Sequence, residues 1–337
     1  MVSPTKTTSS SSILIPFLLC ISSFLPSLTL SFSIRCHPDD QRVLLTLKKS
    51  LNPQQFSLWN PQTDCCDWPS VACDTQTNRV RWLVLSDTTF PGSIPAAVGD
   101  LSHLDYLEFS NIKNLTGSIP YFITKLQKLQ VLTITKTSLS GPIPQFLGQL
   151  KNLGSINLAF NKLTGPIPAS LGDLTNLVYL KLDVNKLTGV IPESLGQLKN
   201  ISGIDLSHNR LSGTIPKSLA GLKFDTLFLS HNKLIGDAST ILMENDNAWA
   251  YDLSYNQLDF DLSNVRFPNR VTELDLSHNR IRGSIPKQMT ELLLAKLDLS
   301  YNQLCGEIPI GGKLQQFRPN SFKNNKCLCG PPLPKCK

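Results

Sequence analysis

The sequence lacks several features that would indicate common classes of protein. After residue 33 it has no apolar run long enough to span a bilayer, and it has no block of like charges although its formal net charge is +7. It contains neither a His-Glu-x-x-His nor a Gly-x-Ser-x-Gly motif. We therefore expect no membrane span after residue 33, no nucleic-acid partner, no cofactor, no bound metal and no catalytic residues.

Cysteine is absent from the long middle of the chain, and apart from Cys20 it forms two groups of four near the ends. Even groups of cysteines indicate disulfide-stapled caps in an oxidising compartment. Zinc is the alternative, but no His-x-x-x-His partner accompanies the cysteines. Spacing alone allows three connectivities within each group. The pairs that we expect are Cys36–Cys65, Cys66–Cys73, Cys305–Cys327 and Cys329–Cys336.

The first 33 residues have the features of a removable signal peptide. They carry a single charge, an apolar stretch over residues 13–30, and small serines at the end. A membrane anchor is the alternative reading, but prolines and serines inside the stretch weaken a spanning helix. We expect cleavage near Ile34 and secretion. In that compartment, sequons at Asn114 and Asn200 are candidate N-glycosylation sites.

A recurring phrase, L-x-x-N-x-L-x-G-x-I-P, dominates the middle of the chain. Its glycine returns every 23 to 25 residues from Gly92 to Gly306, with one unit in which Phe260 replaces it. This period belongs to the leucine-rich class of repeats. The alternating leucines of each unit point to one face of a short strand and are buried by stacking. We expect a right-handed, curved leucine-rich-repeat solenoid with a parallel β-sheet on its concave face.

The same phrase indicates how neighbouring repeats are tied together and where the array ends. We expect the asparagine amide to bond backbone groups of adjacent units in a ladder, with Thr88 and Thr137 replacing it in two early units. The expected boundaries are 1–33 for the signal peptide, 34–80 for the N-terminal cap, 81–306 for ten repeats and 307–337 for the C-terminal cap.

The residue between the two buried positions of each strand should form one column on the concave face. Its later half is acidic, and Phe160 and Trp249 add apolar surface beside it. Acidic groups with exposed aromatics suit a partner that has a basic, partly apolar surface. The alternative is that the aspartates only keep the surface soluble. The column is Val84, Glu108, Thr133, Asn157, Lys181, Asp205, Phe228, Asp252, Asp275 and Asp298.

Two other roles for this face, glycosidase catalysis and zinc binding, have less support from the sequence. Paired carboxylates resemble a glycosidase site, but a smooth array provides no pocket that would give the two acids different environments. His208, His231 and His278 each occur as Ser-His-Asn. A zinc site between the first two is geometrically conceivable, although their placement by the repeat is the simpler explanation.

Several segments together resemble plant polygalacturonase-inhibiting proteins. They are Asp64-Cys65-Cys66-Asp67-Trp68, the repeats with Leu-Thr-Gly-x-Ile-Pro, and the ending from Cys305-Gly306-Glu307 to Cys336. The resemblance implies a secreted, defence-related cell-wall protein that binds fungal or insect endopolygalacturonases through its concave strands. It implies contact roles for Glu108, Val178 and Asp183. The chain departs from the family pattern at Asn157, Phe228 and Trp249.

These departures leave a second function open, a non-inhibitory binding module that acts with receptor kinases or cell-wall ligands in signalling or development. Binding to pectin would require basic residues on the strands, where Lys136, Lys181 and Lys296 are scattered. Ice binding would require a uniform ladder of small hydroxyl or amide groups, and the predicted concave face is mixed and charged.

Overall fold

The computed structural model describes residues 35–51, 54–89 and 92–337. The expected signal peptide therefore lies outside the described residues. No helix in the described ranges is both long enough and apolar enough to cross a bilayer.

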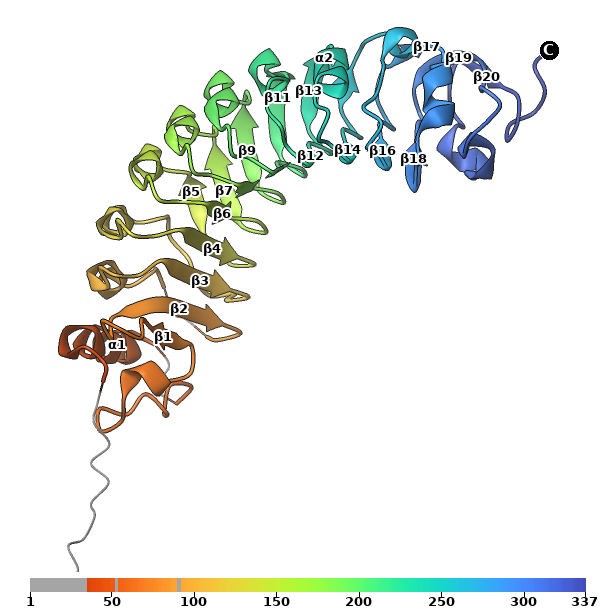
Figure 1. Ribbon diagram of the computed structural model, residues 1–337. Coiled ribbons are helices and arrows are strands. Elements are labelled where there is room, and N and C mark those ends of the chain that lie inside the picture. The colour runs from red at the N-terminus through yellow and green to blue at the C-terminus, as the bar shows by residue number, and fades with distance from the viewer. Residues whose placement is uncertain (1–34, 52–53, 90–91) are drawn as a thin grey trace, which may run out of the picture. The chain divides into compact units, whose positions relative to one another are not determined.

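An 11-stranded sheet takes one strand from each repeat and one, β1, from the N-terminal cap. All its strands pair in parallel except β1, which runs antiparallel to β2. Within residues 35–337, Figure 1 shows these strands on the inner side of the curve and short helices on the outer side. The strands, in spatial order, are β1 (Val71–Cys73), β2 (Val80–Ser86), β3 (Tyr106–Ser110), β4 (Val131–Thr135), β6 (Ser155–Asn157), β8 (Tyr179–Lys181), β10 (Gly203–Asp205), β12 (Thr226–Phe228), β14 (Ala250–Asp252), β16 (Glu273–Asp275) and β18 (Lys296–Asp298).

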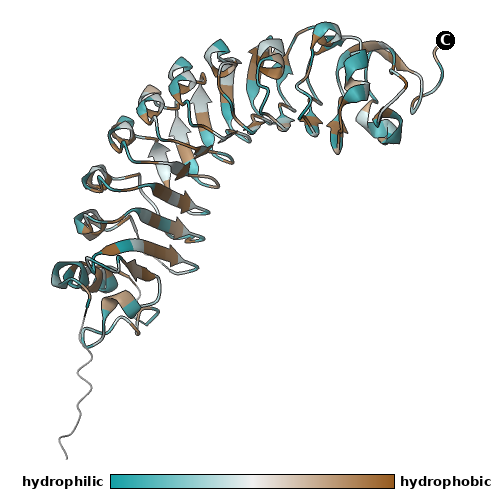
Figure 2. Ribbon diagram, in the orientation of Figure 1, coloured by the Kyte–Doolittle hydropathy of each residue, from teal (hydrophilic) through white to brown (hydrophobic). Residues whose placement is uncertain are grey.

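The core lies between these strands and the outer helices. Alternating residues such as Leu107 and Phe109 of β3 are fully buried, as leucine alternation predicts. Figure 2 shows hydrophobic colours along β2, β3 and β4 and hydrophilic colours on several outer turns. The repeat architecture expected from the sequence is confirmed.

Short helices form the outer side because the proline of each Ile-Pro step fixes the backbone before a single turn. Pro168, for example, directly precedes η5, whose Leu171 is buried. A Cβ on Gly172 would clash with the backbone of Ser194 in the next repeat, so glycine permits close stacking there. The helices are α1 (Pro38–Ser50), η1 (Cys65–Asp67), η2 (Ala96–Asp100), η3 (Tyr121–Lys125), η4 (Gln145–Gln149), η5 (Ala169–Asp173), η6 (Glu193–Gln197), η7 (Lys217–Leu219), α2 (Ser239–Met243), η8 (Leu262–Asn264), η9 (Lys287–Glu291), η10 (Leu314–Gln316) and η11 (Pro319–Ser321).

A second, six-stranded parallel sheet was not expected from the sequence. It forms where the chain leaves the repeat asparagine and runs toward the glycine. Its strands are β5 (Ser140–Pro142), β7 (Lys162–Gly165), β9 (Lys186–Gly189), β11 (Arg210–Thr214), β13 (Lys233–Gly236) and β15 (Gln257–Leu258). A three-stranded sheet continues toward the C-terminus and contains β17 (Arg282–Gly283), β19 (Gln303–Glu307) and β20 (Cys327–Cys329).

The expected asparagine ladder is present and links successive repeats. The Asn256 amide donates to the carbonyls of Leu229 and Leu253 at 3.0 and 3.2 Å, and its Oδ1 accepts from the Leu234 N–H at 2.9 Å. Asn256 is buried, so these bonds satisfy backbone groups that water does not reach. The sequence reading was incomplete in one unit, because buried Ile112 occupies the asparagine position in addition to Thr88 and Thr137.

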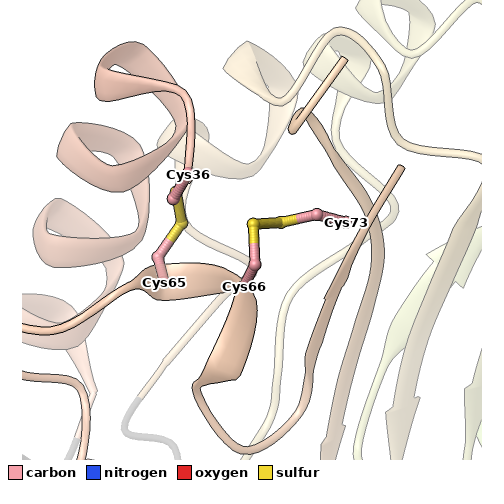
Figure 3. A group of neighbouring side chains, drawn as sticks. All are labelled: Cys36, Cys65, Cys66 and Cys73. Carbon is pink, nitrogen blue, oxygen red and sulfur yellow. A yellow bond between two sulfur atoms is a disulfide. The ribbon is translucent and has the colours of Figure 1, made fainter. Parts of the chain in front are cut away.

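Both ends of the repeat array are closed by disulfides, in the pairs expected from the sequence. These are Cys36–Cys65, Cys66–Cys73, Cys305–Cys327 and Cys329–Cys336. Figure 3 shows the two N-terminal bridges side by side, joining the start of α1, the turn η1 and strand β1. Nearby, Asp40 of α1 forms an ion pair with Arg79 at 2.8 Å and accepts from the Val80 N–H, which fixes the cap against β2.

We predict that Asn256→Ala lowers the free energy of unfolding by about 3 kcal/mol, because several buried backbone groups lose their partner. Asn176→Ala is the control, since the exposed Asn176 amide donates one bond to the Lys151 carbonyl. Its expected cost is below about 1 kcal/mol. Urea unfolding with the disulfides intact measures both values, and equal losses would contradict the structural role of the ladder.

Candidate protein-binding face

The exposed side of the 11-stranded sheet is called here the strand face, and its middle row is the central column. Register pairing aligns one residue from every repeat strand, in the order expected from the sequence. Adjacent strands lie roughly 4.8 Å apart, so neighbouring side chains in the column are in contact range. The members are Val84, Glu108, Thr133, Asn157, Lys181, Asp205, Phe228, Asp252, Asp275 and Asp298.

The aspartates of the central column are held by their own strands. Asp252 accepts from the Ser254 N–H at 3.1 Å and from the Ser254 hydroxyl at 2.6 Å. Asp275 makes the same contacts with Ser277 and lies 3.5 Å from the Lys296 ammonium. These bonds fix the carboxylates in place, and Asp275 is the one whose charge is partly neutralised by a cation.

Burial and like charges make two of the carboxylates weaker acids than usual. Burial raises the pKa of Asp183 to about 6, and the neighbouring Asp205 carboxylate adds to the rise. Burial also raises the pKa of Asp275, with further contributions from Asp252 and Asp298 against the hydrogen bonds of Ser277. The negative charge of the strand face therefore changes in mildly acidic solution.

The other predicted contact residues lie in columns beside the central one. Val178 and Trp249 precede strands β8 and β14 and occupy the edge where the strands begin; Val178 is half-buried and Trp249 is 38% exposed. Phe160, 48% exposed, lies at the opposite edge. Phe228 is half-buried and is aligned between Asp205 and Asp252 of the neighbouring strands.

Sequence reasoning missed a stack of rings along the edge where the strands end, called here the ring ladder. Its centroids are 3.9 to 4.1 Å apart and its planes are within 15° of parallel. Parallel rings direct their nitrogen lone pairs side by side, which argues against the convergent geometry that zinc needs between His208 and His231. The signal in the sequence was the recurrence of His or Tyr between Ser and Asn. The ladder is His208, His231, Tyr255, His278 and Tyr301.

A second missed feature is a basic row on the six-stranded sheet. Strands β7, β9, β11 and β13 each begin with a cation, and all four side chains are exposed. The second sheet was not expected from the sequence, where basic residues were expected to matter only on the inner strands. The basic row is Lys162, Lys186, Arg210 and Lys233.

Both sequon asparagines have exposed side chains away from the central column. Asn114 lies in the turn after Ile112, and Asn200 follows η6 on the outer side. The Asn200 Nδ2 donates to the Thr175 carbonyl at 2.9 Å. An N-linked glycan retains one hydrogen on this nitrogen, so glycosylation of Asn200 is compatible with the bond.

Family models match three parts of the chain, each a leucine-rich-repeat type. A leucine-rich repeat N-terminal domain matches residues 37–74, a leucine-rich repeat region matches 75–233, and a single leucine-rich repeat matches 270–292. A polygalacturonase inhibitor of Vitis vinifera is 56% identical over 309 residues, which is 91% of this chain and 93% of that protein. The chain belongs to the polygalacturonase-inhibitor family. Another member, from Pyrus communis, is 55% identical across 95% of this chain and 99% of that protein.

The chain is also similar to a protein with a different name. The leucine-rich repeat protein FLOR 1 of Arabidopsis thaliana is 52% identical over 92% of this chain and 95% of its own length. Among solved structures, a plant ice-binding protein matches with a TM-score of 0.88 and 42% identity over 90% of this chain and 99% of that chain.

Members named as inhibitors act on an enzyme and are not enzymes. This chain is a leucine-rich-repeat binding protein of the same kind, and its four disulfides fit an extracellular, oxidising compartment.

Asp183 provides a test of the electrostatics of the strand face. Its folded pKa, about 6, exceeds the ordinary value of 3.8, so the folded state binds the proton more tightly than the unfolded state. The resulting stabilisation is complete below about pH 4 and is lost as the pH rises through about 6. We predict that Asp183→Asn matches the parent protein at pH 4 and is more stable at pH 7 by about 1 kcal/mol, a value discounted for solvent screening.

Thermal and urea unfolding at both pH values measure this difference. Asp173→Asn is the control, because Asp173 is exposed at the end of η5 and lies 3.9 Å from Lys151. A difference for Asp183→Asn that is the same at pH 4 and pH 7 would show that burial does not shift the pKa of this carboxyl.

Proposed function

We propose that the chain inhibits a secreted, pectin-degrading endopolygalacturonase of a fungus or an insect in plant defence. The observation that carries the proposal is the aligned acidic half of the central column, in a chain that belongs to the polygalacturonase-inhibitor family. The proposed site of action is the cell wall and apoplast, where both the enzyme and its polymer occur.

Charge complementarity supports polygalacturonase as the partner. The substrate is a polyanion, so an enzyme that holds it requires cations in its cleft. Asp205, Asp252 and Asp298 present carboxylates on every second strand, β10, β14 and β18. Hydrogen bonds from the backbone N–H groups that follow hold these carboxylates in fixed positions. Preformed carboxylates attract such a cleft without reorganising, and a docked repeat array would exclude the polymer.

The aromatic departures from the family pattern suit the same surface. Trp249 precedes β14, and Phe228 occupies the central column one strand earlier, next to Asp252. A shallow hollow of about 210 Å³ is lined by Phe228, Asp252 and Lys296 among others. We propose that Trp249 and Phe228 anchor the partner by burying apolar area, while the aspartates orient it. The remaining contact residues proposed are Glu108, Asn157, Phe160, Val178, Lys181, Asp183 and Asp275.

A reducing-sugar assay on polygalacturonate tests inhibition. Purified mature protein would be titrated against a panel of fungal and insect endopolygalacturonases. We predict that Asp252→Lys raises the inhibition constant at least about ten-fold, since it places a cation against a basic cleft. Trp249→Ala should raise it by about ten-fold through lost apolar contact.

Asp173→Lys is the matched control, because it makes the same charge change on the outer side of the array. It should inhibit like the parent protein. If a folded, disulfide-intact sample inhibits no enzyme in the panel, inhibition is wrong and the alternative stands, a non-inhibitory module that acts with receptor kinases or cell-wall ligands. Ice binding gains no support from the strand face, whose central column mixes carboxylates, a lysine and Phe228.

The basic row favours a second function, binding to pectin itself. Its four cations are exposed on neighbouring strands of the second sheet. Lys162 Nζ donates to a neutral hydroxyl, Ser138 Oγ, at 3.1 Å. A straight polyuronate can pair successive carboxylates with such a row. The second sheet thus supplies the clustered cations that the scattered lysines of the strand face do not.

Retention on immobilised polygalacturonate tests pectin binding. We predict that the double variant Lys186→Glu, Arg210→Glu elutes at much lower salt, with about ten-fold weaker binding in 0.15 M salt, because two attractive charges become repulsive. The control, Lys217→Glu with Lys287→Glu, reverses two exposed lysines that begin the outer helices η7 and η9. Equal retention of both variants would refute a role for the basic row.

A further inference from the structure

The first three repeat strands form the widest part of the strand face. Strands β2, β3 and β4 pair over five residues, whereas the strands from β6 onward pair over three. Figure 1 shows them at the N-terminal end of the array. Two outward rows flank the central column here, and with the column residues between them they are called the aromatic platform. The rows are Trp82, Tyr106 and Val131, where the strands begin, and Ser86, Ser110 and Thr135, where they end.

Two adjacent aromatic rings open the first row. The ring centroids of Trp82 and Tyr106 lie 5.2 Å apart with planes inclined by 32°, and Trp82 is 50% exposed. On its other side Trp82 is paired with Ala72 of β1, whose methyl group is too small to cover an indole. Neighbouring exposed rings are apolar surface of the kind that marks a ligand site.

The same row ends in a third exposed ring. It continues through Ser155 to Tyr179, which is 47% exposed. A Cβ on the buried Gly203 would lie 3.2 Å from Tyr179 Cδ1, so glycine leaves room for the ring to extend over β10. Three strand spacings separate Tyr106 from Tyr179, which is roughly 14 Å. The row is therefore long enough to contact several units of a polymer.

Polar groups beside the rings are fixed by one another. Glu108 accepts from the Tyr106 hydroxyl and from Ser110 Oγ, each at 2.7 Å. Burial and the bond to Glu108 raise the pKa of Tyr106 to about 12, so the phenol keeps its proton. Of the platform's side chains, all of which the structure describes, Glu108 alone carries a charge. The platform thus offers carboxylate and hydroxyl oxygens but no cation.

A polar hollow of about 390 Å³ flanks the first row at the edge where the strands begin. Its lining includes Arg81, Asp105 and Gln130, which directly precede the three residues of that row. Arg81 forms an ion pair with the buried Asp105 and lies 3.8 Å from the Asp74 carboxylate. The cations in the lining, Arg81 and Lys128, are matched by these two carboxylates. The hollow adds hydrogen-bonding groups without a net attraction for anions.

We propose that the aromatic platform binds a neutral polysaccharide of β-1,4-linked pyranose units. Each such unit has an apolar C–H face that stacks on an aromatic ring and a rim of hydroxyls that bond to carboxylate and hydroxyl oxygens. An extended β-1,4-linked chain advances per sugar by close to one strand spacing, roughly 4.8 Å, so its units would keep register with the repeats.

Charge decides between a neutral chain and a polyuronate. The Glu108 carboxylate would face the ligand and would repel a chain that carries a negative charge on every unit. This site is therefore distinct from the basic row. It is also separate from the proposed inhibitory contacts, which lie on later strands except for Glu108.

Tryptophan NMR tests the site directly in the parent protein. The chain contains four tryptophans, of which Trp59 and Trp68 are buried and Trp82 and Trp249 are exposed. With ¹⁵N-labelled indoles each gives one N–H signal, and Trp82→Phe and Trp249→Ala assign the exposed pair. We expect cellohexaose to shift the Trp82 signal and to leave the Trp249 signal in place.

Calorimetry with cellohexaose measures the contribution of the ring. We expect Trp82→Ala to weaken binding at least about ten-fold and Trp82→Phe, which keeps an aromatic face, to stay within about three-fold of the parent. Trp249→Ala is the matched control and should bind cellohexaose like the parent. If Trp82→Ala does not fold, Trp82→Phe and the NMR titration of the parent still decide the result.

Two other hexasaccharides define the ligand class. Hexagalacturonate and the coiled, α-1,4-linked maltohexaose should leave the Trp82 signal unchanged. A Trp82 signal that cellohexaose does not shift, or that either of the other two shifts equally, would overturn the proposal. If cellohexaose shifts it but the parent inhibits no polygalacturonase, the inhibitor function fails and the polysaccharide site stands.

Discussion

The structure depends on satisfying the backbone groups at the turn that follows each inner strand. That turn is buried between repeats, where water cannot bond to it, and the asparagine side chain replaces water by accepting one N–H and donating to several carbonyls. Since each asparagine bonds to its own unit and to the preceding one, each repeat holds its neighbour at a fixed spacing. The hydrophobic core supplies most of the driving force, but leucine packing alone would allow units to slide, whereas the amide permits one register.

The fixed register aligns equivalent residues of successive repeats on the surface. Because each repeat contributes one residue to each column, chemistry that recurs in the sequence is concentrated in a line, as with Asp252, Asp275 and Asp298. Residues of adjacent columns then modify the charge and the pKa of members of that line and of one another. Lys296 neutralises part of Asp275, and Asp205 makes Asp183 a weaker acid. The same register aligns one cation from each of four units into the basic row of the second sheet.

The fold and the central column were predictable because they depend on leucine alternation and a constant period, both visible in the chain. The cysteine pairs were expected but were not determined by spacing. The second sheet and the ring ladder escaped prediction for a different reason. Both depend on backbone geometry after the strand, where the residue before the asparagine takes a left-handed conformation that brings His231 and Tyr255 face to face. Ile112 escaped notice because its unit also contains asparagines at nearby positions.

The left-handed turn has a consequence for how such proteins diversify. At the turn position before the repeat asparagine, Val184 has a φ of 52°. A β-branched side chain rarely adopts this conformation, whereas asparagine and histidine tolerate it. A library randomised at these turns would be filtered first by backbone compatibility and only then by affinity. A library at the central column would meet no such filter. The repeat thereby imposes a backbone constraint on the residues at its turns but not on those of its strands, so new specificities can accumulate on the strands without loss of the register.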